Sequence, residues 1–168
     1  MKEISLHVKV PSSSLSAYSI VFGKNCWKRY LRSFLEKHTF SRVGFLVDEN
    51  VLAGWKKEIE DFEPSDIILI PSGESSKNLD KVIETIGVLT SKGYDRKSLL
   101  VAMGGGVVGD LCGFIASLYM RGIAYVQIPT TVLSIVDSSI GGKTGVDTPY
   151  GKNLVGSFHF NYMVIADT

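Results

Sequence analysis

Cysteine is scarce in this sequence, with only Cys26 and Cys112 among 168 residues. Two thiols so far apart cannot form the disulfide framework of a small secreted protein, although one disulfide remains open as an alternative. Long apolar runs are also missing, so no membrane span is expected. The N-terminal segment alternates apolar and polar residues, which predicts a strand and not a secretory signal. We therefore expect two reduced, packed thiols in a cytoplasmic protein.

An excess of one charge is absent as well, since the formal net charge is +1. This balance argues against nucleic acid or an anionic membrane as the main partner. The three histidines, His7, His38 and His159, lie far apart without metal-ligand spacing, so we expect no metal site from this chain alone. Apolar residues make up 45% of the chain, which is typical of one globular domain with a buried core.

Strand-like segments alternate with helical ones along the chain. Apolar patterns predict strands at 4–10, 18–23, 42–48, 66–71, 98–103 and 124–129, and helices at 25–38, 51–62, 78–93, 107–120 and 130–139. We also expect a turn at 11–16. This order predicts an α/β fold, with a Rossmann-like, mainly parallel sheet, helices on both faces and a single domain over 1–168.

Two of these segments allow more detailed predictions. The strand at 66–71 is apolar throughout, so we expect it to be buried. The helix at 78–93 should end at Gly93, because glycine is the usual residue just beyond a helix. Its apolar face is expected to comprise Leu79, Val82, Ile83, Ile86 and Leu89.

Charge is unevenly distributed, and the second half of the chain has little of it. Residues 104–156 contain six charged side chains: Asp110, Arg121, Asp137, Lys143, Asp147 and Lys152. We expect this region to be largely buried or to face a ligand, which makes its charges candidates for function. Buried structural ion pairs are the alternative, and Lys143 and Lys152 are also compatible with solvated loop lysines.

A glycine-rich loop follows the predicted strand at 98–103. Gly104, Gly106 and Gly109 fit the pattern G-x-G-x-x-G, and a predicted helix follows. Such a loop brings backbone N–H groups and a helix N-terminus to a pyrophosphate. The acid that usually follows about 20 residues later is missing, and Asp48 at the end of an earlier strand is the available ribose ligand. We expect dinucleotide-like chemistry on a rearranged plan.

Two competing interpretations concern nearby residues. The segment "SSIGGKTGV" ends like a phosphate-binding Walker A loop, but Asp137 occupies the place of its first glycine, so this interpretation fails. Asp110 is expected in the first turn of its helix, where an acid also serves simply to cap the helix and complement its dipole.

Three long blocks stand out in the sequence: "GGGVVGDLCGFIASLYMRGI", "QIPTTVLSIVDSSIGGKTGVD" and "GKNLVGSF". They resemble 3-dehydroquinate synthase, an enzyme of the shikimate pathway of aromatic amino-acid biosynthesis, with looser agreement at "VDEN" and "PSGESSK". The resemblance implies a carbon–oxygen lyase that converts 3-deoxy-arabino-heptulosonate 7-phosphate into 3-dehydroquinate and phosphate. It also implies NAD for transient oxidation and re-reduction around phosphate elimination, an aldol cyclisation, and a divalent metal, zinc or cobalt.

The resemblance also implies roles for individual residues. Asp137, Lys143 and Asn153 would contact the substrate, and Arg121 would reach the substrate phosphate of a neighbouring subunit in a homodimer. The residues implied on the cofactor side are Asp48, Asn50, Glu74, Lys77, Gly105, Gly106, Val107, Val108, Gly109, Asp110, Thr130, Thr131, Lys143 and Lys152.

The departures from the family pattern concern the metal site. The family's ligands, a glutamate and two histidines, are not found up to Thr168, so we expect the helical metal-binding domain to be missing and this chain alone to be inactive. His159 is expected to be a local substitution. Another sugar-phosphate cyclase or a polyol dehydrogenase remains an alternative. So does a non-catalytic NAD-binding module, although that would have no use for Asp137, Lys143 and Asn153.

Overall fold

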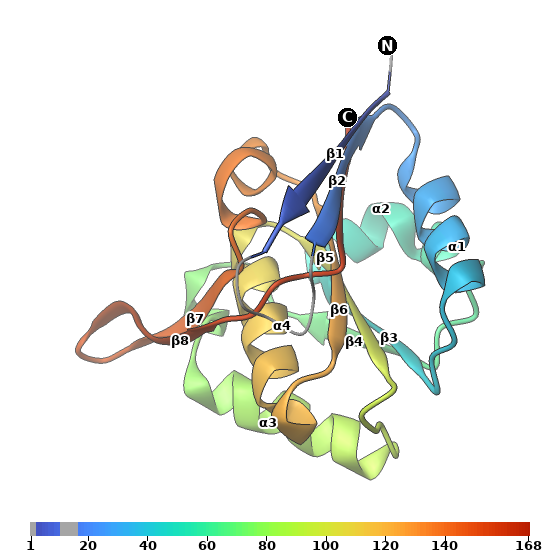
Figure 1. Cartoon of the computed structure of the whole chain (residues 1–168). Helices are drawn as coiled ribbons and strands as arrows, with labels where there is room; N and C mark the ends of the chain where they lie inside the picture. The colour runs from blue at the N-terminus through green and yellow to red at the C-terminus, as the bar shows by residue number, and fades with distance from the viewer. Residues whose placement is uncertain (1–2, 11–16) are drawn as a thin grey trace.

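A seven-stranded sheet forms the centre of the computed structural model, which describes residues 3–10 and 17–168 (Figure 1). The strand order is β1-β2-β9-β6-β5-β3-β4, and only β1 and β2 pair in antiparallel fashion. The strands are β1 (Ile4–Lys9), β2 (Ala17–Gly23), β3 (Val43–Asp48), β4 (Asp66–Ile70), β5 (Leu99–Gly104), β6 (Ala124–Pro129) and β9 (Met163–Asp167). The predicted Rossmann-like α/β fold with a mainly parallel sheet is therefore confirmed.

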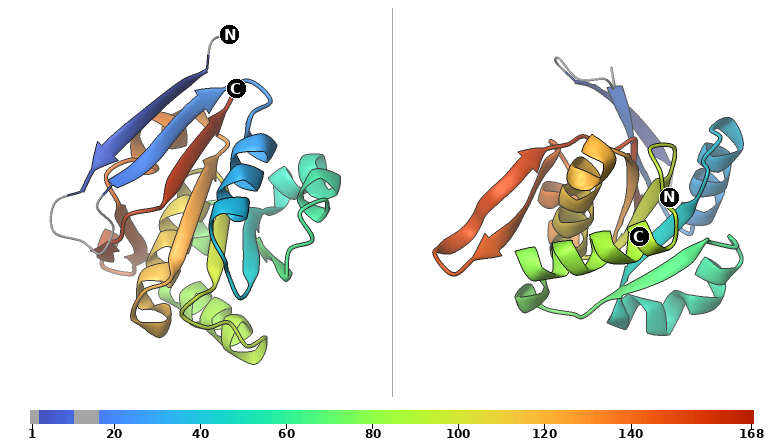
Figure 2. Two further views of the ribbon diagram at one scale, coloured as in Figure 1. Left: turned by 45° about the vertical axis from the view of Figure 1, so that its right-hand side comes forward. Right: turned by 90° about the horizontal axis from the view of Figure 1, so that it is seen from below.

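Helices cover both faces of this sheet (Figure 2). The helices and short helical turns are α1 (Trp27–Lys37), α2 (Glu49–Glu60), η1 (Glu74–Ser76), α3 (Leu79–Ser91), α4 (Gly106–Leu118), η2 (Tyr119–Arg121) and η3 (Ser134–Ser138). Helices α1 and α2 share one hydrophobic cluster with the sheet, whereas α3 and α4 share another on the opposite face. None of the helices in the described part of the chain is long and apolar enough to cross a membrane.

The centre of the sheet explains the apolar sequence around the glycine loop. Every residue of β5 is buried, since it pairs with β3 on one side and β6 on the other. Helix α4 packs on this strand and buries eight of its 13 residues. A strand and a helix that are both enclosed must be apolar on nearly all sides, which fixes the position of the loop between them.

Two sequence predictions about burial are wrong. Strand β4 is the outermost strand of the sheet and not a buried one, and Leu69 on it is 49% exposed. On α3 the apolar face is narrower than expected, because Leu79 and Ile83 point to solvent, Ile83 with 67% exposure. The helix packs on α4 mainly through its buried Val82 and Leu89. It does end as expected, since Gly93 has φ of 72°.

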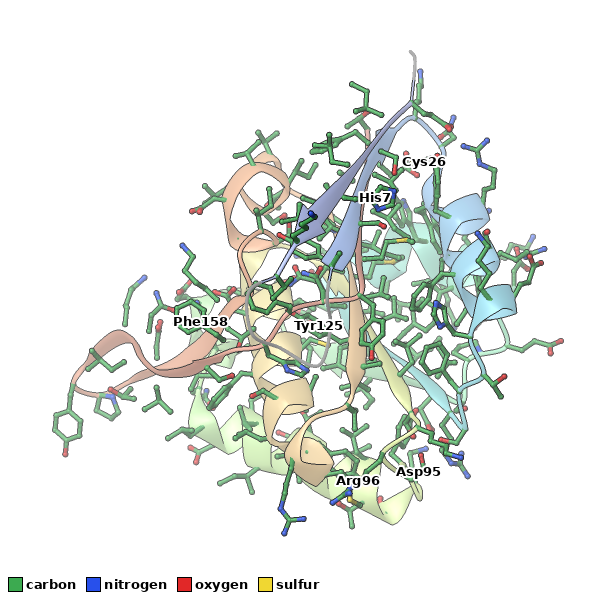
Figure 3. All side chains as sticks on the ribbon, in the orientation of Figure 1. His7, Cys26, Asp95, Arg96, Tyr125 and Phe158 are labelled. Carbon is green, nitrogen blue, oxygen red and sulfur yellow. The ribbon has the colours of Figure 1, made fainter. Side chains whose placement is uncertain are left out.

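A two-stranded hairpin of β7 (Lys143–Thr148) and β8 (Gly151–Phe158) projects from the body of the chain (Figure 1). Of residues 104–156, expected to be largely buried or to face a ligand, α4 and β6 are mostly buried, whereas β8 is mostly exposed. Phe158, at the end of β8 nearest the body, is 79% exposed (Figure 3). The helix expected at 130–139 is shorter, with a single π-helical turn, η3. Both cysteines are free and buried, as expected. The turn predicted at 11–16 lies outside the described residues.

Candidate functional site

A cleft of about 510 Å³ lies at the carboxyl ends of four neighbouring strands, and we call it the strand-end cleft. Asp48 is the last residue of β3, Ser72 follows β4, Gly105 follows β5 and Thr130 follows β6. The full lining is Asp48, Asn50, Val51, Ser72, Gly73, Gly105, Gly106, Val107, Thr130 and Thr131. Four segments that are distant in sequence thus converge on one hollow, because parallel strands end at the same edge of the sheet.

The cleft lies where the connections of the sheet change direction. Strand β3 continues into α2 on one face, whereas its neighbour β5 continues into α4 on the other face. The two loops diverge and leave a crevice between them. In open α/β sheets ligands bind at such a switch point.

The N-terminus of α4 provides unpaired donors to this cleft. Its N-cap is Gly105, which has no side chain to accept a bond, and the first turn contains no acid. The N–H groups of Gly106, Val107 and Val108 come before the first intrahelical hydrogen bonds, so they are available to an anion. Side chains are also excluded here, since a Cβ built at Gly105 would lie 3.3 Å from Thr131 Cγ2. The geometry fits a phosphate or pyrophosphate group.

Asp48 forms the acidic wall of the cleft. Its Oδ1 accepts hydrogen bonds from the backbone N–H of Asn50 at 2.9 Å and from the Ser72 hydroxyl at 2.6 Å. The Asn50 side chain in turn donates to Ser72 Oγ at 2.7 Å, which ties the end of β3 to the end of β4. Both bonds to Asp48 end on the same oxygen, so Oδ2 is left to accept from a diol such as a ribose.

The remaining predicted residues of this cleft contribute mainly backbone. The Thr131 hydroxyl is engaged locally with Ser134 Oγ at 2.9 Å. Val108 is fully buried, and a Cβ at Gly109 would lie 2.7 Å from Gln127 Oε1. The N–H of Gly109 already donates to the carbonyl of Gly105 at 3.1 Å, so packing is the role that the structure shows for it.

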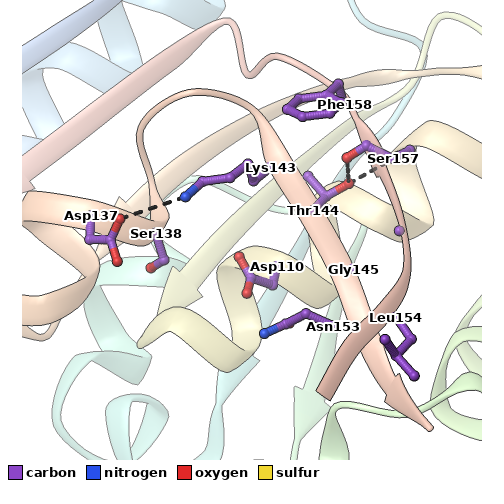
Figure 4. Close-up of a pocket in the computed structure, with 11 residues that line it drawn as sticks. Asp110, Asp137, Ser138, Lys143, Thr144, Gly145, Asn153, Leu154, Ser157 and Phe158 are labelled. Atoms are coloured by element: carbon purple, nitrogen blue, oxygen red, sulfur yellow. Dashed lines mark hydrogen bonds and ion pairs between the residues drawn. The ribbon is translucent and has the colours of Figure 1, made fainter. Parts of the chain in front are cut away.

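A second cleft of about 440 Å³ lies between α4, η3 and the β7–β8 hairpin, and we call it the hairpin cleft (Figure 4). It brings together four predicted site residues, namely Asp110, Asp137, Lys143 and Asn153. Lys143 Nζ lies 3.9 Å from Asp137 Oδ1, and both side chains are about two-thirds exposed. These groups offer an ammonium, carboxylates and an amide, which suits a ligand with hydroxyl groups and negative charge.

Lys77 connects the elements around these clefts. Its ammonium donates to Asp110 Oδ2 and to Asn153 Oδ1, each at 2.6 Å, and its side chain is only 6% exposed. Burial raises the pKa of Asp110, and the hydrogen bond from Lys77 counteracts this. Asp110 is the fifth residue of α4 and not in its first turn, so the interpretation as a helix cap is wrong.

Three further predicted residues lie outside both clefts. Glu74 pairs with Lys152 at 3.6 Å and, with Lys77, lines a neighbouring pocket of about 600 Å³. Arg121 follows the C-terminal end of α4, whereas Asp110 is near its start, so the chain does not bring Arg121 to its own hairpin cleft. Met120 and Arg121 both have positive φ, of 51° and 67°, so the turn holds the arginine in an uncommon conformation.

The histidine near the end of the described chain has a packing role. His159 stacks on Tyr125 at 5.4 Å, and its Nε2 lies 2.9 Å from the carbonyl oxygen of Ile123. Within residues 3–10 and 17–168, no group of three or more His, Cys, Asp or Glu side chains is arranged to hold a metal ion.

Sequence reasoning missed several residues that line the clefts. Ser72 and Gly73 belong to "PSGESSK", one of the segments that resemble the family. The residues missed in the hairpin cleft are Ser138, Thr144, Gly145, Leu154, Gly156, Ser157 and Phe158. The turn residues Pro149 and Gly151 between two short segments were the available signal for this hairpin.

The fold and the strand-end cleft define the class, which is a Rossmann-like α/β domain with a ligand crevice at a topological switch point. The family described as "3-dehydroquinate synthase N-terminal" matches residues 67–168, which is more than half of the chain. A 3-dehydroquinate synthase of Dictyoglomus turgidum is 44% identical over 99% of this chain and 45% of its own length. The chain belongs to the 3-dehydroquinate synthase family and corresponds to its N-terminal domain. It spans less than half the length of the curated relatives that it matches.

Solved structures of related cyclases have the same fold. A 2-deoxy-scyllo-inosose synthase complexed with carbaglucose-6-phosphate, NAD⁺ and Co²⁺ superposes with a TM-score of 0.83, at 25% identity over 98% of this chain and 45% of that one. A 2-epi-5-epi-valiolone synthase from Streptomyces hygroscopicus with NAD⁺ and Zn²⁺ has a TM-score of 0.77, at 27% identity over 95% and 45%. These relatives bind NAD and a divalent metal.

Proposed function

We propose that this chain is the NAD-binding part of an enzyme that converts 3-deoxy-arabino-heptulosonate 7-phosphate into 3-dehydroquinate and phosphate. The observation that carries the proposal is the strand-end cleft, where an uncapped helix N-terminus lies opposite the carboxylate of Asp48. An anionic diphosphate and a ribose diol need these two groups side by side. Family membership supports the choice of reaction.

The residues present fit NAD. The amides of Gly106, Val107 and Val108 would hold the diphosphate, while Asp48 and Asn50 would hold the adenosine ribose. Thr130 and Thr131, which also line the cleft, would bind the nicotinamide half. When bound, NAD supplies a reversible hydride acceptor for a substrate hydroxyl. This chain's contribution is to orient that acceptor and to shield it from water.

The hairpin cleft is the proposed substrate side. Lys143 and Asn153 would hold substrate oxygens, and Asp137 would accept hydrogen bonds from substrate hydroxyls. Asp110, Glu74, Lys77 and Lys152 would position the cofactor near it. An ammonium group beside an amide and hydroxyl groups favours an acidic, phosphorylated substrate.

Further groups are needed to complete the site. We propose that a helical domain, not represented in residues 1–168, supplies the metal ligands, so that this chain alone turns nothing over. We also propose a homodimer in which Arg121 reaches the neighbouring subunit's substrate, since its turn lies away from the cleft of its own chain. The whole enzyme would work in the cytoplasm.

Calorimetric titration of this chain with NAD⁺ tests the cofactor half of the proposal. We expect saturable binding that is lost in Gly106→Val, because a side chain at Gly106 would enter the cradle and collide with Ser138, whose Oγ would lie 3.1 Å from a Cβ built at that position. Gly54→Val is the matched control on α2, where nothing lies within 4 Å. Absence of binding by the unaltered chain would overturn the assignment of NAD.

The reaction itself needs the longer protein. A phosphate-release assay with 3-deoxy-arabino-heptulosonate 7-phosphate and Zn²⁺ should show turnover by the full-length protein and none by residues 1–168. A related cyclase activity is the second candidate, because the structural match to 2-deoxy-scyllo-inosose synthase extends over 98% of the chain. Glucose 6-phosphate in the same assay distinguishes the two, since preference for it would replace our assignment.

A further inference from the structure

Lys77 does not itself line the hairpin cleft, yet its ammonium binds two residues that do. Its ammonium donates to Asp110 on α4 and to Asn153 on β8, each at 2.6 Å. Its carbonyl oxygen accepts from the N–H of Asp147 at 2.8 Å. Asp147 Oδ1 in turn accepts from the N–H of Asn153 at 2.8 Å. This circuit of hydrogen bonds therefore links Lys77 to the hairpin through both its side chain and its backbone.

This circuit holds the hairpin at a point where the chain is otherwise exposed. Asn153 has φ of 54°, a conformation that few residues other than asparagine, aspartate and glycine adopt readily. Its neighbours Lys152 and Leu154 are exposed, so packing does not fix its side chain. The ammonium of Lys77 is buried, and a buried donor without its acceptors would be costly. The lysine thus determines where the amide of Asn153 points.

We propose that Lys77 is a positioning residue that couples the cofactor side of the site to the substrate side. This rests on the proposed function, in which Asp110 faces the cofactor and Asn153 faces the substrate. A cofactor that binds beside Asp110 without moving it keeps Asp110 hydrogen-bonded to Lys77. Lys77 in turn keeps Asn153 and the hairpin in place. Cofactor binding consequently prepares the substrate cleft before the substrate arrives.

Hydrogen exchange of the hairpin in this chain tests the positioning role without any ligand. The variant is Lys77→Met combined with Asp110→Asn, because the second change avoids leaving a buried carboxylate without its cation. Amides of residues 151–158 should exchange roughly 10- to 100-fold faster, as expected for the loss of a hydrogen bond to a charged group. Lys81→Met is the matched control, since the ion pair of Lys81 among the described residues is with Glu84 on the same helix, and hairpin exchange should be unchanged.

A second pair of variants keeps the test decisive if the double variant does not fold. Asn153→Gly removes the acceptor at an exposed position and tolerates positive φ, whereas Asn153→Asp keeps an acceptor there. Hairpin exchange should be faster in Asn153→Gly and close to that of the unaltered chain in Asn153→Asp. Equal exchange in both variants would overturn the positioning role.

The coupling is tested by repeating the exchange with saturating NAD⁺. NAD⁺ should slow hairpin exchange in the unaltered chain and not in Asn153→Gly, while calorimetry shows NAD⁺ affinities of the two within about twofold. Equal protection in both would overturn the coupling. If the unaltered chain fails to bind NAD⁺, the proposed function loses its cofactor, whereas the ligand-free comparison still decides whether Lys77 positions Asn153.

Discussion

Gly113 of α4 lies directly against Thr144 of β7, and a Cβ built at Gly113 would lie 2.5 Å from Thr144 Cγ2. The same Cβ would also lie 3.0 Å from the hydroxyl oxygen of Tyr125, which is fully buried. The hairpin can approach the helix this closely only because position 113 has no side chain. The width of the hairpin cleft therefore depends on this glycine.

We expect Gly113→Ala to destabilise the chain by about 1–3 kcal/mol, because the methyl group overpacks a closed interface. Chemical denaturation measures the loss. Gly87→Ala on α3 is the control, since nothing lies within 4 Å of a Cβ there and alanine favours helix. That variant should be more stable by about 0.5–1 kcal/mol. Equal effects of the two substitutions would contradict the close packing of α4 and β7.

Asp48→Asn should weaken NAD⁺ binding roughly 10- to 100-fold, because a charged acceptor for the ribose diol is replaced by a neutral one. Its Oδ1 remains as an acceptor, so the cap on α2 is kept and thermal stability should change little. Asp61→Asn, at the other end of α2, is the control and should leave affinity unchanged. Calorimetry gives both affinities. An unaltered affinity in Asp48→Asn would show that Asp48 does not bind the ribose.

Neither cysteine should react with a thiol reagent in the folded chain at pH 8. Cys26 is 1% exposed and Cys112 is fully buried, and burial raises the pKa of both thiols, that of Cys26 to about 11. The thiolate is the reactive form, so burial slows the reaction in two ways: it keeps the reagent away from the sulfur, and it keeps the thiol protonated. The absorbance of the chromophore that the reagent releases should correspond to two thiols per chain only after denaturation. Fast labelling of one thiol in the folded chain would show that its cover opens.

Stability should fall as the pH rises from about 9 to about 11. The Cys26 thiol has an ordinary pKa of 9.0 and a folded pKa of about 11, so the unfolded chain loses this proton first. Below pH 9 both states are protonated and the stability is complete, whereas between the two values unfolding is increasingly favoured. Burial also raises the pKa of Tyr94 and Tyr125, which acts in the same direction. Urea midpoints against pH measure this slope, and Cys26→Ala should reduce it.

The periodic parts of the sequence predicted the sheet and its helices well, because burial on both faces leaves a continuous apolar pattern. The glycine loop and Asp48 were also located correctly, since strand ends are easily identified in such a fold. Edge position was not predictable: β4 is as apolar as a central strand, and it is exposed because no strand in the described part of the chain pairs with its outer side. The order of strands is a tertiary property that local pattern does not encode.

The polar contacts between distant segments were the least predictable part. Lys77, Asp110 and Asn153 are 33 and 43 residues apart in the sequence, and only the position of the hairpin over α4 brings them together. The sequence identified each as a candidate. It contained no signal that the ammonium of Lys77 binds both other side chains, because that depends on how the segment after η1 packs against α4 and β8.

The residues that line the strand-end cleft are spread over positions 48 to 131, a span of half the chain. A molecule seated there would act as a temporary cross-link among four separate βα units. Occupancy and folding are then linked by mass action, so ligand at 100 times its dissociation constant would raise stability by about 2.7 kcal/mol. The melting temperature thus provides a sensitive screen for ligands of this cleft, even where no turnover is measured.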